Sequence, residues 1–355
     1  MKDVPALLEK AVSGRRLSLE EGILLMEKAD LLALGTAANR IRQKLHPDGI
    51  VTYVIDRNIN YTNVCVCGCH FCAFYRRPGD RDAYVIDKPQ LDKKIRETLA
   101  AGGTELLIQG GLHPSLNIDF FIDMLRYIKK NYDIHIHSFS PPEIVHLSRL
   151  SGLPVADVLA QLKQAGLDSL PGGGAEILVD RVRKLISPNK ISWRQWMEVM
   201  DAAHRLGMKT TATMMFGHVE TPAEQVKHMV RVREQQDATG GFTAFIPWSF
   251  QPRNTKLGGQ TAGGALYLRV LAMARIMLDN IPNIQASWVT QGAKMAQVAL
   301  NFGANDFGST MLEENVVRAA GVSYRVGLKE IRRVIKDAGF TPAQRRTDYT
   351  LVEQA

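Results

Sequence analysis

The stretch Cys65-Val66-Cys67-Gly68-Cys69-His70-Phe71-Cys72 holds all four cysteines of the 355-residue chain. Cysteines that serve only as small buried residues are scattered along a sequence, so this clustering indicates metal binding or redox chemistry. Three of them, Cys65, Cys69 and Cys72, form the pattern C-x3-C-x2-C. Thiolates at this spacing can converge on one iron–sulfur cluster, and three of them leave one iron of a [4Fe–4S] cube open to another ligand.

Two other interpretations of the cysteines stay open at this point. A structural zinc site needs four ligands, which His70 or Cys67 would complete, but the sequence lacks the second cysteine knuckle typical of such sites. A disulfide framework fits poorly, because the cysteines are adjacent and crowded in a large chain without an apolar signal segment, whereas redox thiols stay possible. We expect Cys67 to be a non-ligand.

The composition is typical of a globular protein and limits the classes of function. Apolar residues make up 45% of the chain, which suits a sizeable core, and no long apolar run predicts a membrane span. The formal net charge is +8, but Lys and Arg are dispersed among Asp and Glu, which favours solvated helix faces over a nucleic-acid surface. The sequence therefore predicts a cytoplasmic protein with no nucleic-acid or membrane partner.

From residue 49 onward, β-rich segments alternate with segments of helical periodicity. The strands are predicted at 51–55, 105–109, 134–139, 168–170, 209–216, 242–250 and 284–289, with a last short segment from 305. About eight strand–helix units in this order predict a parallel sheet, and hence an α/β fold, a (β/α)8 TIM-type barrel. An open doubly wound sheet is the alternative, but no G-x-G-x-x-G turn supports it.

Helical segments flank the predicted barrel. Ser18-Leu19-Glu20-Glu21 is a capping box that begins an amphipathic helix. We predict a helical N-terminal extension at 1–48, the barrel at 49–318 and a helical C-terminal tail at 319–355, all within one structural unit.

In a barrel of this type, the carboxyl ends of the strands carry the chemistry. The cysteine stretch follows the first predicted strand, so we expect it at that end. The exits of the later strands supply further polar or glycine-rich residues, namely Gly110, Gly111, His113, Ser140, Glu176, His218, Arg253 and Asp306. We predict that His113, His218 and Asp306 are candidates for proton transfer. Glu176 is expected to be exposed or to hold a partner, because an unpaired buried carboxylate is costly.

The aromatic residue Phe71 before the last cysteine completes the pattern C-x3-C-x-aromatic-C, which resembles the radical S-adenosylmethionine (SAM) superfamily. The motifs Asn60-Tyr61-Thr62-Asn63-Val64-Cys65, Ile108-Gln109-Gly110-Gly111-Leu112-His113-Pro114 and Phe139-Ser140-Pro141-Pro142-Glu143-Ile144 narrow this resemblance. They resemble the group that includes aminofutalosine synthases, dehypoxanthine futalosine cyclases and the radical subunits of deazaflavin (FO) synthase. The stretch Ile246-Pro247-Trp248-Ser249-Phe250-Gln251-Pro252 makes the chain most similar to the cyclases.

The resemblance implies a [4Fe–4S] cluster on Cys65, Cys69 and Cys72, with SAM bound to the open iron. It implies that a 5′-deoxyadenosyl radical removes a ribose hydrogen from dehypoxanthine futalosine, after which the sugar radical adds to the benzoate ring. A flavodoxin or ferredoxin is the expected electron donor. The other residues that the resemblance assigns are Phe74, Gly110, Gly111, Ser140 and Glu176 for SAM, and Tyr61, Arg76 and Arg253 for the substrate.

Two alternative functions follow from the same residues. An aminofutalosine synthase or a deazaflavin synthase subunit would use the same cofactors in a different reaction. A zinc or iron–sulfur binding protein without catalysis belongs to another class. Metal analysis and a visible spectrum after anaerobic reconstitution separate a zinc site from an iron–sulfur site.

Overall fold

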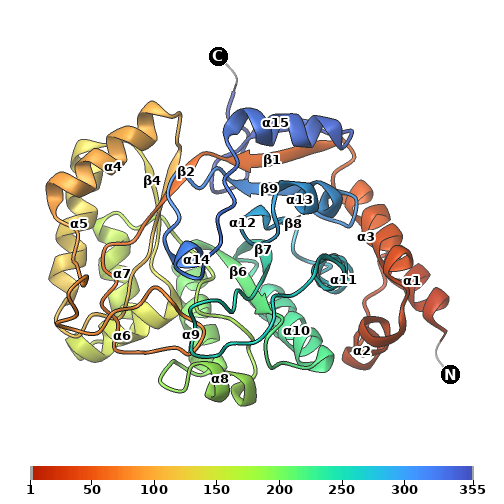
Figure 1. Cartoon of the computed structure of the whole chain (residues 1–355), viewed down its shortest axis with the longest axis horizontal. Helices are drawn as coiled ribbons and strands as arrows, with labels where there is room; N and C mark the ends of the chain where they lie inside the picture. Colours follow the sequence, from red (N-terminus) through yellow and green to blue (C-terminus); the bar gives the residue numbers. More distant parts are fainter. Residues whose placement is uncertain (1–2, 354–355) are drawn as a thin grey trace.

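Parallel strands alternate with helices in the computed structural model, which describes residues 3–353 (Figure 1). The strands are β1 (Ile50–Val54), β2 (Asp56–Ile59), β3 (Glu105–Ile108), β4 (His135–Ser138), β5 (Ser169–Leu170), β6 (Lys209–Phe216), β7 (Phe242–Ser249), β8 (Asn283–Ile284), β9 (Asp306–Ser309) and β10 (Thr341–Gln344). The helices are α1 (Val4–Val12), α2 (Leu19–Lys28), α3 (Leu31–Leu45), α4 (Lys88–Ala100), α5 (Ile118–Asn131), α6 (Pro141–Ser151), α7 (Val155–Ala165), α8 (Asp180–Ile186), α9 (Trp193–Arg205), α10 (Pro222–Thr239), α11 (Gly264–Met277), α12 (Trp288–Gln291), α13 (Ala293–Leu300), α14 (Val316–Ala319) and α15 (Leu328–Asp337).

The strands of the described residues form two sheets that share one extended segment. β2 to β8 make a seven-stranded parallel sheet in chain order, and β1 lies between β10 and β9 in a second sheet. Ile55 alone separates β1 from β2, so residues 50–59 run through both sheets. On the opposite side, the Ala286 N–H donates to the Asp306 carbonyl (2.8 Å) and the Asn305 N–H to the Ile284 carbonyl (3.1 Å). These links curl the strands around one lumen.

The fold is therefore the predicted TIM-type barrel, with an incomplete hydrogen-bond ladder between its two sheets. One predicted strand differs from the structure. β8 ends at Ile284, and residues 288–291 form α12 instead of continuing the strand. The Ser287 N–H donates to the hydroxyl of Tyr267 (2.7 Å), so the chain turns out of the sheet toward α11 at this point.

Local signals explain where several of the outer helices begin. Ser18, Ser192 and Thr221 each cap a helix by accepting a hydrogen bond from the backbone N–H three residues later. In each case a Glu or Gln side chain returns a bond to the N-cap backbone. These reciprocal bonds satisfy donors that a helix N-terminus otherwise leaves unpaired.

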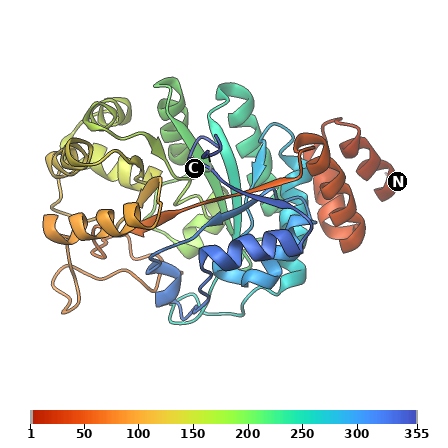
Figure 2. The ribbon, with the colours of Figure 1, turned by 90° about the horizontal axis from the view of Figure 1, so that it is seen from above.

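The two ends of the chain lie outside the ring of strands. α1 to α3 pack beside α10 and α11 at one edge of the molecule (Figures 1 and 2). β10 pairs with β1 in parallel register, Ile50 opposite Thr341, so the C-terminal segment contains a strand besides α15. The cysteine segment and the C-terminus lie at opposite ends of the barrel (Figure 1). Among the helices of residues 3–353, none combines the length and apolar character that a membrane crossing requires.

Candidate active site at the cysteine loop and barrel cavity

The cysteines lie in the segment that follows β2, residues 60–76, which we call the cysteine loop. Backbone hydrogen bonds fix this loop to several strand exits. The Val66 N–H donates to the Leu112 carbonyl (3.0 Å), the His70 N–H to the Ile186 carbonyl (2.8 Å) and the Leu257 N–H to the His70 carbonyl (2.8 Å). The loop therefore spans the carboxyl end of the barrel, where this fold carries its chemistry.

All four cysteines are free thiols. Cys69 is buried and its Sγ lies 3.5 Å from the Sγ of Cys67. The hydrogen bond between Cys69 and Cys67 lowers the pKa of Cys69 to about 7, while burial raises the pKa of Cys65 and of Cys72. In the described part of the chain, no three His, Cys, Asp or Glu side chains are gathered tightly enough to hold a single metal ion.

Arg76 holds the end of the cysteine loop in place. Its Nη1 donates to the carbonyls of Ala73 (3.3 Å), Phe74 (3.2 Å) and Tyr75 (2.9 Å). Its Nε donates to Asp82 (2.6 Å), and the Cys65 N–H donates to the Arg76 carbonyl (2.9 Å). The guanidinium predicted to bind substrate thus pins the backbone after Cys72, including that of Phe74.

Glu143 joins three strand exits through one buried carboxylate. Its Oε1 accepts bonds from the Tyr61 hydroxyl (2.8 Å) and the Gly110 N–H (3.1 Å). Its Oε2 accepts from the Ser140 N–H (2.7 Å) and hydroxyl (2.5 Å). Burial raises the pKa of Glu143, and the bonds from its partners oppose that shift. We call these four residues the Glu143 cluster, and three of them were predicted site residues.

The two predicted glycines pack directly against the start of the cysteine loop. A Cβ on Gly110 would come within 2.5 Å of the Tyr61 ring, and one on Gly111 within 2.2 Å of the Val64 carbonyl oxygen. The Gly111 N–H also donates to the Thr62 carbonyl (3.0 Å). A side chain at either position would displace the loop, because backbone and ring atoms in a packed core cannot yield that far.

Glu176 belongs to a buried charge group beneath the cysteine loop. Its carboxylate lies 2.8 Å from Lys190 Nζ and 3.5 Å from Arg183 Nη1. Lys190 also lies 5.1 Å from the centre of the Phe71 ring. Burial by itself lowers the pKa of Lys190, but the nearby Cys69 and Glu176 raise it above its ordinary value. Glu176 thus holds a partner, and it has a positive φ of 40°, a strained conformation for glutamate.

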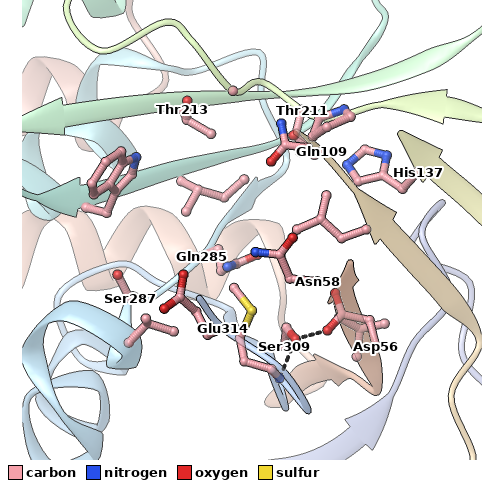
Figure 3. A pocket seen from close by; sticks show the side chains of 18 of the residues that line it. Asp56, Asn58, Gln109, His137, Thr211, Thr213, Gln285, Ser287, Ser309 and Glu314 are labelled. Atoms are coloured by element: carbon pink, nitrogen blue, oxygen red, sulfur yellow. Dashed lines mark hydrogen bonds between the residues drawn. The ribbon is translucent and has the colours of Figure 1, made fainter. Parts of the chain in front are cut away.

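A cavity of about 280 Å³ fills the lumen of the barrel beneath the loop (Figure 3). Its lining includes the polar residues Asp56, Asn58, Gln109, His137, Thr211, Thr213, Gln285, Ser287, Ser309 and Glu314. Leu107, Ile246, Trp248 and Trp288 supply apolar surface on the same walls. Glu176 and Gly173 line it too, so the cavity extends to the loops at the carboxyl end.

Sequence reasoning did not predict the polar residues of this cavity. A signal for them was present, because Asp56 and Asn58 are two residues apart on β2, as are Thr211 and Thr213 on β6. Residues at that spacing share one face of a strand. Polar residues alternating in this way on barrel strands indicate a lumen that is not filled by packing. Burial lowers the pKa of His137 to about 3, so this histidine is neutral.

The remaining predicted residues do not gather at the cavity. His113 is partly exposed and His218 lines a different, outer pocket, where its Nε2 bonds to the Met215 carbonyl (3.0 Å). Burial lowers the pKa of both histidines. Asp306 is buried at the start of β9 and pairs with Arg345 (2.5 Å). Arg253 is exposed.

The cysteine loop offers ligands of the kind that an iron–sulfur cluster needs. Three free thiols, Cys65, Cys69 and Cys72, supply the soft donors that such a cluster needs. Lys190 adds positive charge beside Cys69, which suits a cluster with anionic thiolate ligands.

Two sequence models match the chain. That of the radical SAM superfamily covers residues 59–232, which includes the cysteine loop. The second model, described as the CofH/MqnC C-terminal region, covers residues 239–355. Together they span nearly all of the barrel and the C-terminal segment.

Curated relatives match over almost the full chain. The cyclic dehypoxanthine futalosine synthase of Halalkalibacterium halodurans is 48% identical over 98% of this chain and 95% of its own length. The 5-amino-6-(D-ribitylamino)uracil–L-tyrosine 4-hydroxyphenyl transferase of Methanopyrus kandleri is 43% identical over 99% of this chain and 97% of its own. Among solved structures, methylornithine synthase (PylB) superimposes with a TM-score of 0.75 over 95% of this chain and 97% of its own. The two sequences are 17% identical, so this match shows a similarity of fold alone.

Proposed function

This chain belongs to the radical SAM superfamily, and we propose that it cyclises dehypoxanthine futalosine to cyclic dehypoxanthine futalosine in menaquinone biosynthesis. The relative from Halalkalibacterium halodurans, which carries the name of that synthase and is 48% identical over 98% of the chain, supports this reaction. The Streptomyces coelicolor protein of the same name is 44% identical over 98% of the chain. The observation that carries the proposal is this full-length identity combined with a cysteine loop placed over a polar cavity.

We assign Cys65, Cys69 and Cys72 as the ligands of a [4Fe–4S] cluster, with Cys67 outside the ligand set. When bound, the cluster and SAM supply a 5′-deoxyadenosyl radical that removes a hydrogen atom from the substrate. A flavodoxin or ferredoxin in the cytoplasm is the proposed source of electrons.

The chain's own residues prepare the site for these groups. The Glu143 cluster fixes the exits of β2, β3 and β4 relative to one another through bonds of 2.5 to 3.1 Å. Lys190 and Glu176 fill the space beneath Cys69 with a paired charge. Because the chain's own groups make these bonds, the protein itself holds the geometry of the site. Gly110, Gly111 and Ser140 are then proposed to line the SAM site.

The cavity is proposed to hold the substrate beneath the cysteine loop. Its polar wall offers hydrogen bonds to a sugar, and Trp248, Trp288 and Ile246 offer apolar surface to an aromatic ring. A flexible nucleoside-derived molecule must be held in one pose for its sugar radical to reach the ring, and contacts with several walls of the cavity provide that restriction.

The proposal is tested by product analysis after anaerobic reconstitution with iron and sulfide. The protein is incubated with SAM, a reductant and dehypoxanthine futalosine, and the products are identified by mass spectrometry. We expect 5′-deoxyadenosine and a cyclised product two hydrogen atoms lighter than the substrate. Cys69→Ala is the negative control, and Cys67→Ala is the matched variant in the same loop. Release of 5′-deoxyadenosine no higher than in Cys69→Ala contradicts the proposal, as does an adenosyl group built into the product.

A second reaction is favoured by the archaeal relatives, which are nearly as similar. The Methanothermobacter thermautotrophicus protein, named a 5-amino-6-(D-ribitylamino)uracil–L-tyrosine 4-hydroxyphenyl transferase, is 44% identical over 98% of the chain. A parallel incubation with that uracil and tyrosine decides between the two. If product forms only in the incubation with the uracil and tyrosine, the chain catalyses the transferase reaction.

A further inference from the structure

A chain of three hydrogen-bonded side chains leads from the cavity toward the amino end of the barrel. His137 on β4 lines the cavity, and its ring points into the lumen (Figure 3). Its Nδ1 lies 2.6 Å from the hydroxyl of Ser169, the residue opposite it on β5. The same hydroxyl lies 2.7 Å from Nε2 of His135, two residues back along β4. We call His137, Ser169 and His135 the histidine relay.

The histidine relay is closed in its middle and open at both ends. Ser169 is 2% exposed. Nε2 of His137 and Nδ1 of His135 have no hydrogen-bond partner among the described residues, and neither is one of the unpaired atoms that the protein seals from solvent. His137 is 6% exposed and lines the cavity, so it presents Nε2 there. His135 is half-buried and does not line the cavity, so its Nδ1 meets solvent at the start of β4.

One hydroxyl between two imidazole rings allows two arrangements of the protons. Burial lowers the pKa of His137 to about 3 and lowers that of His135 as well, so both rings are neutral and each carries one proton. Ser169 has a single proton, so it donates to one ring and accepts from the other. When Ser169 donates to His135, His137 donates from Nδ1 and its Nε2 is a free acceptor toward the cavity. When Ser169 donates to His137, that Nε2 carries the proton instead.

The proposed cyclisation releases a proton inside the barrel. After the sugar radical has added to the benzoate ring, the attacked ring carbon still holds its hydrogen and the ring is no longer aromatic. When that C–H bond breaks, the hydrogen leaves as a proton and the electron pair of the bond returns to the ring. One electron then leaves the ring for the oxidised iron–sulfur cluster, a one-electron acceptor, and aromaticity is restored. The product has lost two hydrogen atoms, the first of them to 5′-deoxyadenosine.

We propose that His137 is the catalytic residue that accepts this ring proton at Nε2, with Ser169 and His135 as positioning residues that pass a proton on to solvent. As Nε2 of His137 binds the incoming proton, its Nδ1 proton moves to the Ser169 hydroxyl. The hydroxyl proton moves to Nε2 of His135, and the Nδ1 proton of His135 leaves to water. Neither ring ends with two protons, so a weakly basic buried imidazole is sufficient. After the product leaves, exchange with water at the two open ends restores the first arrangement.

Carboxyl groups line the same cavity, but each of them is already engaged. Glu176 forms an ion pair at 2.8 Å. Glu314 accepts hydrogen bonds from three backbone N–H groups of α14. Asp56 and Glu105 each accept a bond from a neighbouring hydroxyl. Among the described residues that line the cavity, His137 is the titratable side chain that joins an accessible lone pair to a hydrogen-bonded route outward.

Two variants test the inference, which rests on the proposed function because another reaction would release a different proton. The rate of cyclised product is measured in the reconstituted holoenzyme with SAM, a reductant and dehypoxanthine futalosine. His137→Gln keeps a polar side chain that cannot take up the proton, and product should form about 100-fold more slowly. Ser169→Ala leaves His137 in place and breaks the route behind it, so product should form about tenfold more slowly. An unchanged rate in either variant overturns the inference.

His204→Gln is the matched control. His204 also lies between two hydroxyls, those of Thr239 (2.6 Å) and Thr210 (2.7 Å), but it does not line the cavity. This variant should form product at the wild-type rate, and a loss equal to that of His137→Gln overturns the inference. Glu314→Gln tests a carboxylate as the proton acceptor, and a larger loss there than in His137→Gln overturns the inference too.

An organic radical separates proton transfer from a structural role. When only the proton acceptor is missing, the sugar radical still adds to the ring, so the adduct radical should accumulate in freeze-quenched samples of His137→Gln. Electron paramagnetic resonance detects it, and deuterium on the benzoate ring should narrow its signal, because the unpaired electron is spread over that ring. The absence of a radical, or a signal that ring deuteration leaves unchanged, overturns the inference.

Binding and product formation together show which proposal has failed. The affinity of the holoenzyme for dehypoxanthine futalosine, measured anaerobically by calorimetry without SAM, should be the same in wild type, His137→Gln and Ser169→Ala. A loss of affinity that accounts for the slower product overturns the inference. If wild type forms no cyclised product, the proposed function fails and the inference fails with it. If wild type forms the product and both variants form it equally fast, the inference alone fails.

Discussion

Replacing Glu143 with glutamine tests the carboxylate that joins three strand exits. Each carboxylate oxygen accepts two hydrogen bonds, one oxygen from Tyr61 and Gly110 and the other from Ser140. A glutamine side chain has the same shape but only one acceptor oxygen, and its NH2 group donates. Whichever way the amide is turned, one backbone N–H, that of Gly110 or that of Ser140, faces another donor, and the hydroxyl beside it must turn to accept.

The expected cost follows from this count of bonds. Glu143→Gln leaves one buried backbone N–H without an acceptor, which costs about 1–3 kcal/mol, and replaces bonds to a charged group by weaker neutral ones. We expect the free energy of unfolding to fall by about 3 kcal/mol or more. Tyr61→Phe removes only one of the four bonds and should cost about half as much. In the double variant the two costs should not add, because both changes act on the same oxygen pair.

Urea unfolding of the cluster-free protein measures both effects, from the midpoint at a constant slope. The matched control is Glu330→Gln on α15, a half-buried residue whose carboxylate lies 3.8 Å from the exposed Arg333. An exposed pair of this kind contributes little, so the control should unfold close to wild type. A Glu143→Gln midpoint equal to that of the control refutes the reasoning, because the carboxylate would then not be the acceptor of four bonds.

Three further predictions concern the cysteines and the buried charges. Cys69→Ala should abolish SAM cleavage in the reconstituted protein, whereas Cys67→Ala should largely keep it. The release of 5′-deoxyadenosine measures both, and retained cleavage in Cys69→Ala would remove Cys69 from the ligand set. Lys190→Met should lower the free energy of unfolding by about 3–5 kcal/mol, because it leaves Glu176 buried with only a longer pair to Arg183; an unchanged urea midpoint argues against the pair. Because the pKa of Asp56 is raised to about 8 in the folded protein, its stabilising contribution is complete below pH of about 4 and is lost as pH rises toward 8. Asp56→Asn should therefore gain stability relative to wild type as pH increases over that range, and a constant difference contradicts the raised pKa.

The barrel itself was predictable because its signals are local. Alternating β-rich and amphipathic segments specify strands and helices without knowledge of the rest of the chain. β10 was missed because Thr341-Pro342-Ala343-Gln344 has no alternating apolar pattern and contains proline. It forms a strand because β1 offers an edge opposite β9. Pairing of this kind depends on where distant segments lie.

The candidate site was only partly predictable for the same reason. The cysteine pattern is a contiguous motif, and Ser140 with Glu143 is recognisable as a capping box. The sequence does not reveal that Glu143 also accepts bonds from Tyr61 and Gly110, which are 82 and 33 positions away. Such contacts are created by the tertiary fold. Arg76 was predicted to contact the substrate because of its charge. In the structure its guanidinium donates hydrogen bonds to the backbone of the adjacent loop, a local role that its charge does not indicate.

We propose that Cys65, Cys69 and Cys72 hold an iron–sulfur cluster whose fourth iron binds SAM. The most direct test is the electron paramagnetic resonance spectrum of the anaerobically reconstituted and reduced protein, recorded before and after SAM is added. We expect a [4Fe–4S] signal that changes when SAM binds, in wild type and in Cys67→Ala alike. A spectrum that SAM leaves unchanged, or a protein that holds no iron, would contradict it.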